Sequence, residues 1–188
     1  MSLPDVVRLE YDEIRSAANL EKHGWRFIEV LETWEASAIR IHTPESGVTA
    51  AKPEDVDACA AIARKAFTKS RLHKDPMVSK EDADDFKEQW VRLAFTERAK
   101  KIFVARSVQG EIQGFIIIIQ KEGIGIVDLL AVHPDHKSEG VGGRLLRHAM
   151  MATGLPFRAG TQSDNKEARI LYKRNGFEIK RRQRTYHR

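Results

Sequence analysis

Apolar positions along the second half of the chain alternate between the spacing of strands and the spacing of helices. The two-residue pattern predicts strands at 101–108, 112–120, 124–132, 155–162 and 177–186. The helical pattern predicts helices at about 141–150 and 165–175. Within the second strand, residues 116–119 are four consecutive isoleucines, which is typical of a central strand covered on both faces.

Two further helices precede these strands. A short strand at 48–51 leads into a helix that opens with Pro53 and acidic residues, as the helix dipole favours. After a polar loop at 68–78, Ser79 caps a second helix that runs to about residue 99. The resulting order, β-α-α-β-β-β-α-β-α-β, predicts an α/β (α+β) fold: a mixed, mostly antiparallel sheet with helices on both faces.

The first 46 residues have a weaker pattern. They predict strands at 6–9, 25–32 and 38–41 and a helix at 12–22. Residues 43–47, Thr-Pro-Glu-Ser-Gly, are typical of a turn and of a boundary. We therefore expect an N-terminal extension or remnant subdomain at 1–46 and the main domain at 47–188.

Composition narrows the class of protein. Hydrophobic residues make up 41% and charged residues 31%, as in globular domains, and no apolar run approaches the roughly 18 residues of a membrane span. The single cysteine, Cys59, lies on an apolar helix face, which favours packing over chemistry and a reducing cytoplasmic location. Much of the net charge of +5 lies at 180–188, without the interleaved aromatic residues of single-strand binders. We expect either a solvated basic strand or one that attracts a phosphate-bearing small ligand, with no nucleic-acid or membrane partner.

The most informative stretch is 124–150. His133-Pro134-Asp135 ends its strand, and three glycines, Gly140, Gly142 and Gly143, crowd the first turn of the helix that follows. Bare backbone there leaves the first N–H groups of the helix uncovered, and such a place binds phosphate. The alternative is a glycine-rich turn that binds no ligand.

Two motifs resemble those of the GNAT superfamily of acetyl-CoA-dependent N-acetyltransferases. The stretch Lys137-Ser138-Glu139-Gly140-Val141-Gly142 resembles the central pattern of Gln or Arg, two residues, Gly, one residue, then Gly or Ala, with lysine in first place. Farther on, Asn165, Ala168, Tyr172 and Gly176-Phe177 match the spacing of the second motif. The resemblance covers about residues 48–186 and implies the GNAT fold.

The resemblance also implies a cofactor site and a catalytic acid. Acetyl-CoA would be the co-substrate, with no metal. Its binding residues would be Leu130, Ala131, Val132, Lys137, Ser138, Gly140, Val141, Gly142, Gly143, Asn165, Ala168 and Tyr172. The backbone around Leu130–Val132 would supply the oxyanion donor, and Tyr172 would protonate the departing sulfur. Alternatively, Tyr172 is a core residue and Asn165 only caps its helix, and for Asn165 both roles can hold.

The resemblance leaves the base less defined. Asp128 lies two residues before Leu130, where many relatives hold a carboxylate, and the alternative is an acid at the strand edge outside the site. His73 and His133 are expected to be loop histidines, and Glu81, Asp82, Asp84 and Asp85 a solvated helix face. The sequence contains no close cluster of cysteines and histidines, so it predicts no metal site.

Three short segments, at 23–29, 66–72 and 86–90, resemble bacterial TDP-fucosamine acetyltransferases, which acetylate a nucleotide-linked amino sugar. In that case Ser70, Arg71 and Lys74 would face an anionic nucleotide and Trp90 would form an apolar wall for the sugar. The alternative is a surface loop and a core tryptophan. The sequence thus predicts an N-acetyltransferase acting in a ternary complex on a primary amine of a small molecule, as a monomer or homodimer. A protein or peptide N-acetyltransferase and a non-catalytic acyl-CoA-binding module remain alternatives, with an unrelated phosphate- or nucleic-acid-binding domain as a more distant third.

Overall fold

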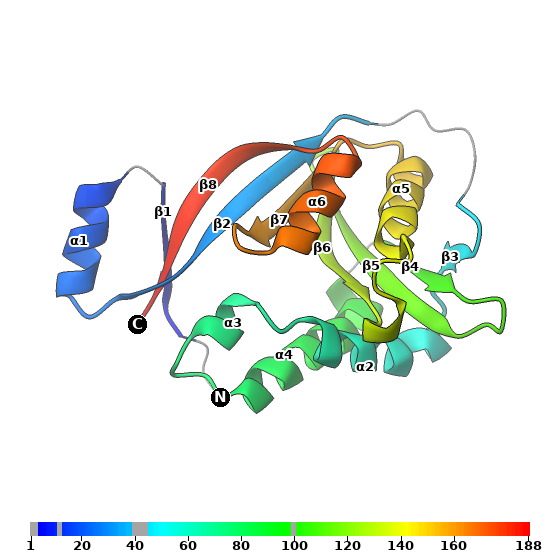
Figure 1. The fold of residues 1–188 in the computed structure, drawn as a ribbon, viewed down its shortest axis with the longest axis horizontal. Coiled ribbons are helices and arrows are strands. Elements are labelled where there is room, and N and C mark those ends of the chain that lie inside the picture. The colour runs from blue at the N-terminus through cyan, green and yellow to red at the C-terminus, as the bar shows by residue number, and fades with distance from the viewer. Residues whose placement is uncertain (1–3, 11–12, 39–44, 99–100) are drawn as a thin grey trace.

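The computed structural model describes residues 4–10, 13–38, 45–98 and 101–188, which form a mixed sheet covered by helices (Figure 1). Its strands are β1 (Val6–Glu10), β2 (Arg26–Ala36), β3 (Val48–Ala50), β4 (Lys101–Arg106), β5 (Ile112–Lys121), β6 (Ile124–Val132), β7 (Phe157–Gln162) and β8 (Glu178–His187). Its α-helices are α1 (Ile14–Lys22), α2 (Val56–Ala66), α3 (Arg71–Lys74), α4 (Lys80–Leu93), α5 (Val141–Thr153) and α6 (Lys166–Arg174). Short 3₁₀ turns lie at Pro53–Asp55 and Pro134–His136, and a π-helical turn lies at Ala94–Arg98.

The strands pair in the order β1-β8-β2-β7-β6-β5-β4-β3. Every pairing is antiparallel except that of β6 with β7. Since α5 connects these two parallel strands, it must cross a face of the sheet. The predicted fold class, a mostly antiparallel mixed sheet with helices on both faces, is confirmed.

Local sequence explains where several helices begin and end. The Ser79 hydroxyl accepts a hydrogen bond from the Asp82 N–H at 3.0 Å and caps α4. Gly154 ends α5 in the left-handed conformation, with φ of +64°, which glycine adopts without strain. The predicted loop at 68–78 differs from the structure because it contains α3, a single helical turn whose Leu72 is buried.

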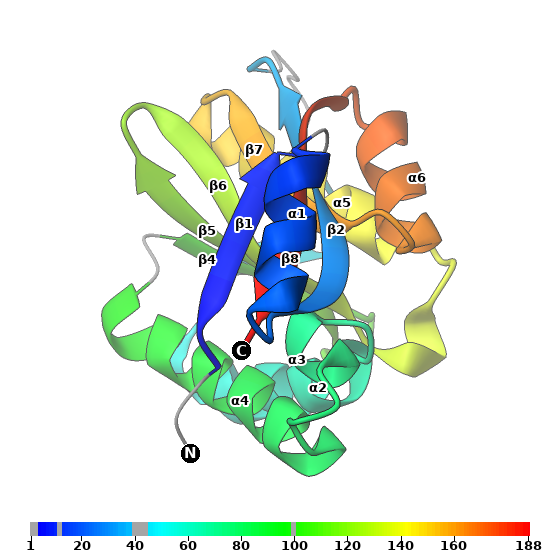
Figure 2. The same cartoon turned by 90° about the vertical axis from the view of Figure 1, so that its left-hand side faces the viewer.

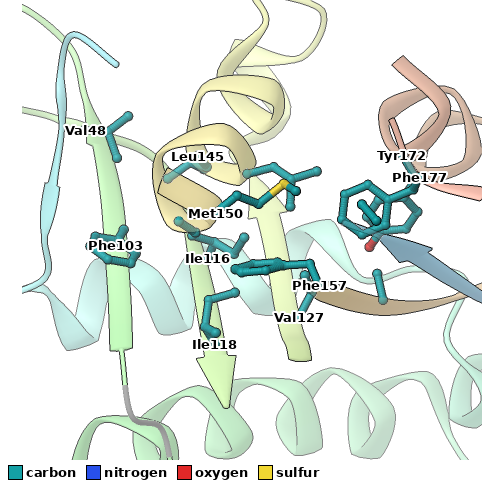
Figure 3. Packing of buried hydrophobic residues seen from close by; sticks show 14 of the residues in the cluster. Val48, Phe103, Ile116, Ile118, Val127, Leu145, Met150, Phe157, Tyr172 and Phe177 are labelled. Carbon is teal, nitrogen blue, oxygen red and sulfur yellow. The ribbon is translucent and has the colours of Figure 1, made fainter. Parts of the chain in front are cut away.

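Two hydrophobic cores lie on opposite faces of the sheet. In the first, α5 and α6 cover the sheet with Leu145, Met150 and Tyr172 (Figure 3). In the second, α2 and α4 cover the other face. The central strand β5 divides between the cores: Ile116 and Ile118 enter the first, whereas Phe115 and Ile117 enter the second. The prediction of a strand covered on both faces is confirmed.

The fate of Cys59 agrees with the sequence analysis. Its side chain is fully buried in the second core, and this burial raises the pKa of its thiol to about 12. A thiol that stays protonated is a poor nucleophile. Cys59 therefore serves packing.

The N-terminal strands extend the same sheet. β1 pairs with β8, and β2 lies between β8 and β7, while α1 lies over this end of the sheet (Figure 2). The strands expected at 6–9 and 25–32 and the helix expected at 12–22 are thus found, whereas most of the strand expected at 38–41 lies outside the described residues. The boundary at residue 46 stays a prediction. No described helix has the length and apolar character needed to span a membrane.

Candidate functional site

The two parallel strands separate soon after they meet. β6 pairs with β7 only at Gly125–Phe157, Ile126–Arg158 and Val127–Ala159. Beyond this point β7 continues along β2 to Gln162, whereas β6 continues along β5 to Val132. The sheet is therefore open between the second half of β6 and the end of β7.

A β-bulge at Asp128 marks the start of this opening. In the pairing of β5 with β6, Ile118 lies opposite Val127 and Ile117 lies opposite Leu129, so that Asp128 is the extra residue. The bulge interrupts the alternation of side chains between the two faces of the sheet, so that Val127 packs in the first core and Leu129 in the second. It also turns the Asp128 side chain toward α4.

Backbone N–H groups of β6 face the opening. The His133 N–H donates to the Gln113 carbonyl of β5 at 2.7 Å. Because N–H groups alternate in direction along a strand, those of Leu130 and Val132 point away from β5. Two fixed donors are thus directed at the space between the strands.

The N-terminus of α5 lies at the same opening. Gly140 precedes the helix with φ of +76°, and the first intrahelical bond runs from the Arg144 N–H to the Gly140 carbonyl at 3.1 Å. The N–H groups of Val141, Gly142 and Gly143 are therefore available to an anion. Ser138 also has a positive φ, +67°, so that the 138–140 loop curls around the helix end.

A cleft of about 820 Å³ joins these features. The predicted site residues that line it are Ser70, Asp128, Leu130, Ala131, Val132, Lys137, Ser138, Gly140, Val141, Gly142, Gly143, Asn165, Ala168 and Tyr172. Arg71, Lys74 and Trp90 do not line it. The cleft is lined by residues from α5 and α6 on one side of the sheet and from α2 and α4 on the other. Two ligands can therefore approach it from opposite sides.

The cleft is electropositive. Its charged lining consists of Lys69, Lys87, Lys137, Arg147, Arg174, Asp128 and Glu167. The carboxylate of Glu139, in the loop before α5, does not line the cleft and lies 3.1 Å from His136. The Glu139 carboxylate is therefore directed to His136 and not into the cleft, where an anion would bind at the start of α5.

Tyr172 projects from α6 into the first core and the cleft. Its ring centroid is 5.3 Å from that of Phe177 and 6.1 Å from that of Trp34. Burial raises the pKa of the Tyr172 hydroxyl above its usual value, so that it stays protonated at neutral pH. A protonated phenol beside the opening can act as a proton donor.

Asn165 caps α6, as the alternative interpretation expected. Its side-chain oxygen accepts from the Ala168 N–H at 3.2 Å. The residue also lines the cleft, and its amide nitrogen is the group left for a ligand.

Asp128 contacts Trp90 of α4 on the α2–α4 side of the cleft. The Trp90 indole N–H donates to the Asp128 carboxylate at 2.9 Å, and the Lys87 ammonium lies 4.7 Å from the Trp90 ring centroid. Trp90 therefore holds Asp128 rather than lining the cleft itself.

The three residues expected to face a nucleotide differ in the contacts that they make. Ser70 lines the cleft, whereas the ammonium of Lys74 pairs with Asp164 at 2.8 Å. Arg71 is half-buried, and burial followed by the neighbouring charge of Arg8 lowers its guanidinium pKa. That Ser70, Arg71 and Lys74 face an anionic nucleotide stays a prediction.

Several residues of the cleft escaped the sequence analysis. They are Lys69, Lys87, Arg147 and Arg174, together with Thr161 and Gln162 at the end of β7. His73 and Asp84 also differ from expectation: Asp84 is buried, and its carboxylate lies 2.9 Å from the His73 ring. The sequence signals for the cleft residues were the segments at 66–72 and 86–90, which contain Lys69 and Lys87, and the predicted end of the strand at residue 162. No group of three or more metal-ligating side chains is present among the described residues.

Comparison with known proteins agrees with the fold. Residues 98–179 match the family model described as the acetyltransferase (GNAT) domain. The structure also resembles two solved ones: a GCN5-related N-acetyltransferase from Sphaerobacter thermophilus and a putative GNAT-family acetyltransferase from Novosphingobium aromaticivorans. The TM-scores are 0.70 and 0.64 at 17% and 18% identity, covering 98% and 99% of this chain and 60% and 74% of theirs. Residues 98–179 are thus a GNAT acetyltransferase domain, a kind of domain that generally uses acetyl-CoA.

A curated relative gives a more particular comparison. The chain is 31% identical over 140 residues to the spore coat polysaccharide biosynthesis protein SpsD of Bacillus subtilis. The alignment covers 72% of this chain and 48% of that protein, so that the chain spans about half the length of this relative.

Proposed function

We propose that the protein transfers an acetyl group from acetyl-CoA to a primary amine of a small, sugar-like acceptor in a ternary complex. The observation that carries this proposal is that one cleft is lined by the start of α5, the open edge of β6 and Tyr172. The relative whose name places it in polysaccharide biosynthesis supports a sugar acceptor. The electropositive lining supports an acceptor bearing phosphate, such as a nucleotide-linked amino sugar.

The residues present fit coenzyme A. The N–H groups of Val141, Gly142 and Gly143 would bind its pyrophosphate, assisted by Lys137 and Ser138. A Cβ at Gly140 would meet no atom within 4 Å, so there is room for a phosphate against the backbone. Asn165 and Ala168 would line the path of the pantetheine arm, whose thioester supplies the acetyl group.

The opening between β6 and β7 would hold the reacting carbonyl. The N–H groups of Leu130 and Val132, with Ala131 between them, would stabilise the negative charge that develops on its oxygen. Removing one such donor typically costs about 3 kcal/mol of transition-state stabilisation. Tyr172 would then donate its proton to the departing sulfur.

The acceptor would enter from the α2–α4 side. Asp128, held by the Trp90 indole, would attract the protonated amine and assist its deprotonation. Lys69 and Lys87 on the same side would attract acceptor phosphates. Arg71 and Lys74 lie farther from this position, and Trp90 would act through Asp128.

The test combines calorimetry of coenzyme A binding with thiol release from acetyl-CoA. The acceptors are TDP-4-amino sugars, polyamines, amino acids and peptides. In Tyr172→Phe we expect the rate to fall by about 100-fold while coenzyme A affinity is kept. Tyr186→Phe is the matched control, because Tyr186 is a buried tyrosine of β8 whose hydroxyl has no partner.

Each alternative has its own outcome. Acetylation of peptides alone would favour a protein N-acetyltransferase. Tight binding of coenzyme A without acetylation of any amine would favour a binding module. An equal loss of rate in Tyr172→Phe and Tyr186→Phe would remove the acid role from Tyr172.

A further inference from the structure

A serine, a histidine and an aspartate form a hydrogen-bonded chain at the α2–α4 side of the cleft. The Ser70 hydroxyl lies 2.7 Å from His73 Nδ1, and His73 Nε2 lies 2.9 Å from Asp84 Oδ1. The side chains of His73 and Asp84 are 4% and 9% exposed. Ser70 is the member of the chain that lines the cleft.

Helix capping does not account for this arrangement. Ser70 precedes α3, yet its hydroxyl caps no backbone N–H of that helix. Ser79, which precedes α4 in the same way, makes the ordinary cap to the Asp82 N–H. The Ser70 hydroxyl is instead directed to the imidazole.

The protonation of the chain follows from Asp84. Burial alone would raise the pKa of its carboxyl, but hydrogen bonds from Lys80 and His73 hold that pKa below its usual value. An ionised Asp84 accepts a hydrogen bond from the Nε2–H group of His73. In the neutral ring Nδ1 is then the acceptor, and the Ser70 hydroxyl donates to it. A base therefore stands behind the serine.

The surrounding charges leave this polarity in place. Other charged groups on the elements of this region include Arg71 and Lys74 on α3, Arg26, Glu29 and Glu32 on β2, Arg8 on β1, and Lys80, Glu81, Asp82, Asp85, Lys87, Glu88 and Arg92 on α4. Lys74 is engaged by Asp164 and Lys80 by Asp84. Asp84 is the carboxylate bonded to His73.

We propose that Ser70, backed by His73 and Asp84, is a proton relay that deprotonates the acceptor ammonium. This inference rests on the proposed acetyl transfer. The ammonium N–H gives its proton to Ser70 Oγ while the Ser70 O–H gives its own to His73 Nδ1. The products are a neutral amine and an imidazolium paired with Asp84.

The relay completes the proton balance of the reaction. An ammonium has three N–H bonds and the product amide has one, so two protons must leave nitrogen. One of these protons restores the proton that Tyr172 gives to the sulfur. The other is held by His73 and returns through Ser70 to solvent after the product leaves. Imidazole suits this task because one ring nitrogen can take a proton while the other stays hydrogen-bonded to a carboxylate. Asp128 would then assist only by holding the ammonium through its charge, and Ser70 rather than Asp128 would take the proton.

The test measures kcat/KM against pH with acetyl-CoA and the amine that wild type acetylates fastest. We expect Ser70→Ala and His73→Gln to lower kcat/KM by about 100-fold at pH 7, with the loss shrinking at high pH, where the amine is already neutral. Asp84→Asn should shift the pH profile, and Ser70→Thr, which keeps the hydroxyl, should restore activity. Coenzyme A affinity and thermal midpoints are measured for every variant.

Two matched controls separate the relay from folding effects. Ser79→Ala removes a serine that only caps its helix, and Asp85→Asn removes an exposed carboxylate from α4. Neither should change the pH profile. Imidazole ¹⁵N spectra of wild type should show the Nε2–H tautomer of His73.

The outcomes distinguish this inference from the proposed function. If wild type acetylates amines and Ser70→Ala keeps its rate and pH profile, the relay is wrong while the function stands. If wild type acetylates no amine, the proposed function fails and the relay fails with it. Mass-spectrometric detection of an acetyl group on Ser70 during turnover would also overturn the relay, because the serine would then be a nucleophile.

Discussion

Asp75 and His187 form a buried pair that links two distant parts of the chain. The imidazole Nδ1 lies 2.6 Å from the carboxylate, both side chains are fully buried, and Arg26 approaches the other carboxylate oxygen at 3.3 Å. Burial opposes ionisation of Asp75, but hydrogen bonds from the Met77 N–H, His187 and Arg26 hold its pKa below the usual range. The loop after α3 is thereby fixed to the end of β8.

This pair predicts a specific loss of stability in acid. Because the folded pKa of Asp75 lies below the unfolded value of about 4, its contribution is present above pH 4 and lost as pH falls through the folded pKa. Asp75→Asn should lower the free energy of unfolding at pH 7 by about 3 kcal/mol and flatten its decline between pH 5 and 2. Urea unfolding at several pH values measures both effects. Asp57→Asn, at an exposed position of α2, is the control, and an equally steep decline in Asp75→Asn would contradict the assignment.

At the scale of elements, the start of α5 depends on one backbone conformation. Gly140 has φ of +76° and nothing within 4 Å of a Cβ, whereas a Cβ at Gly142 would make ordinary contacts of 3.5–3.6 Å. Alanine at position 140 therefore tests the effect of the backbone conformation, and alanine at position 142 tests the effect of the added volume.

We expect Gly140→Ala to destabilise the fold by about 1 kcal/mol, since alanine disfavours a positive φ. It should also weaken coenzyme A binding, because the N–H groups of the first turn would change direction. Gly142→Ala should keep the affinity and stabilise the helix by about 0.5 kcal/mol. Calorimetric titration and thermal unfolding measure the two effects. Equal affinities in the two variants would show that the 138–140 loop does not set the site.

The elements also show what sequence could and could not predict. The four isoleucines of β5 and the cap of α4 are local signals, and both predictions are confirmed. Strict alternation places Asp128 and Leu130 on one face of β6, but the bulge turns Asp128 toward α4. The contact of His73 with Asp84 depends on how α3 packs beside α4, which no sequence period encodes. Motif spacing thus located the cleft, whereas residues supplied by tertiary packing were missed.

At the scale of the molecule, the described strands form one continuous sheet. The N-terminal strands β1 and β2 hold no sheet of their own, because their partners are β8 and β7. Trp34 of β2 packs in the same core as Met150 and Phe157. A division at residue 46 would therefore cut through a shared core.

We expect the whole chain to unfold in one transition. Far-UV circular dichroism and tryptophan fluorescence should give coincident urea curves, and the calorimetric and van't Hoff enthalpies should agree. Trp34→Phe should shift both curves together. Two separated transitions would instead show that residues 1–46 are an independent subdomain.

The order of the strands has a consequence for synthesis on the ribosome. Strands β3 to β6 are contiguous in sequence, and they pair with one another within residues 48–132. β2 emerges before all of these, yet both of its partners, β7 and β8, are made last. Since contacts so distant in sequence form late, β2 must stay unpaired while most of the chain is translated. The half of the sheet that holds β1 and β2 can close only once β7 and β8 have been synthesised, so that the unpaired edge of β2 is open until then to pairing with other chains, which chaperones would prevent.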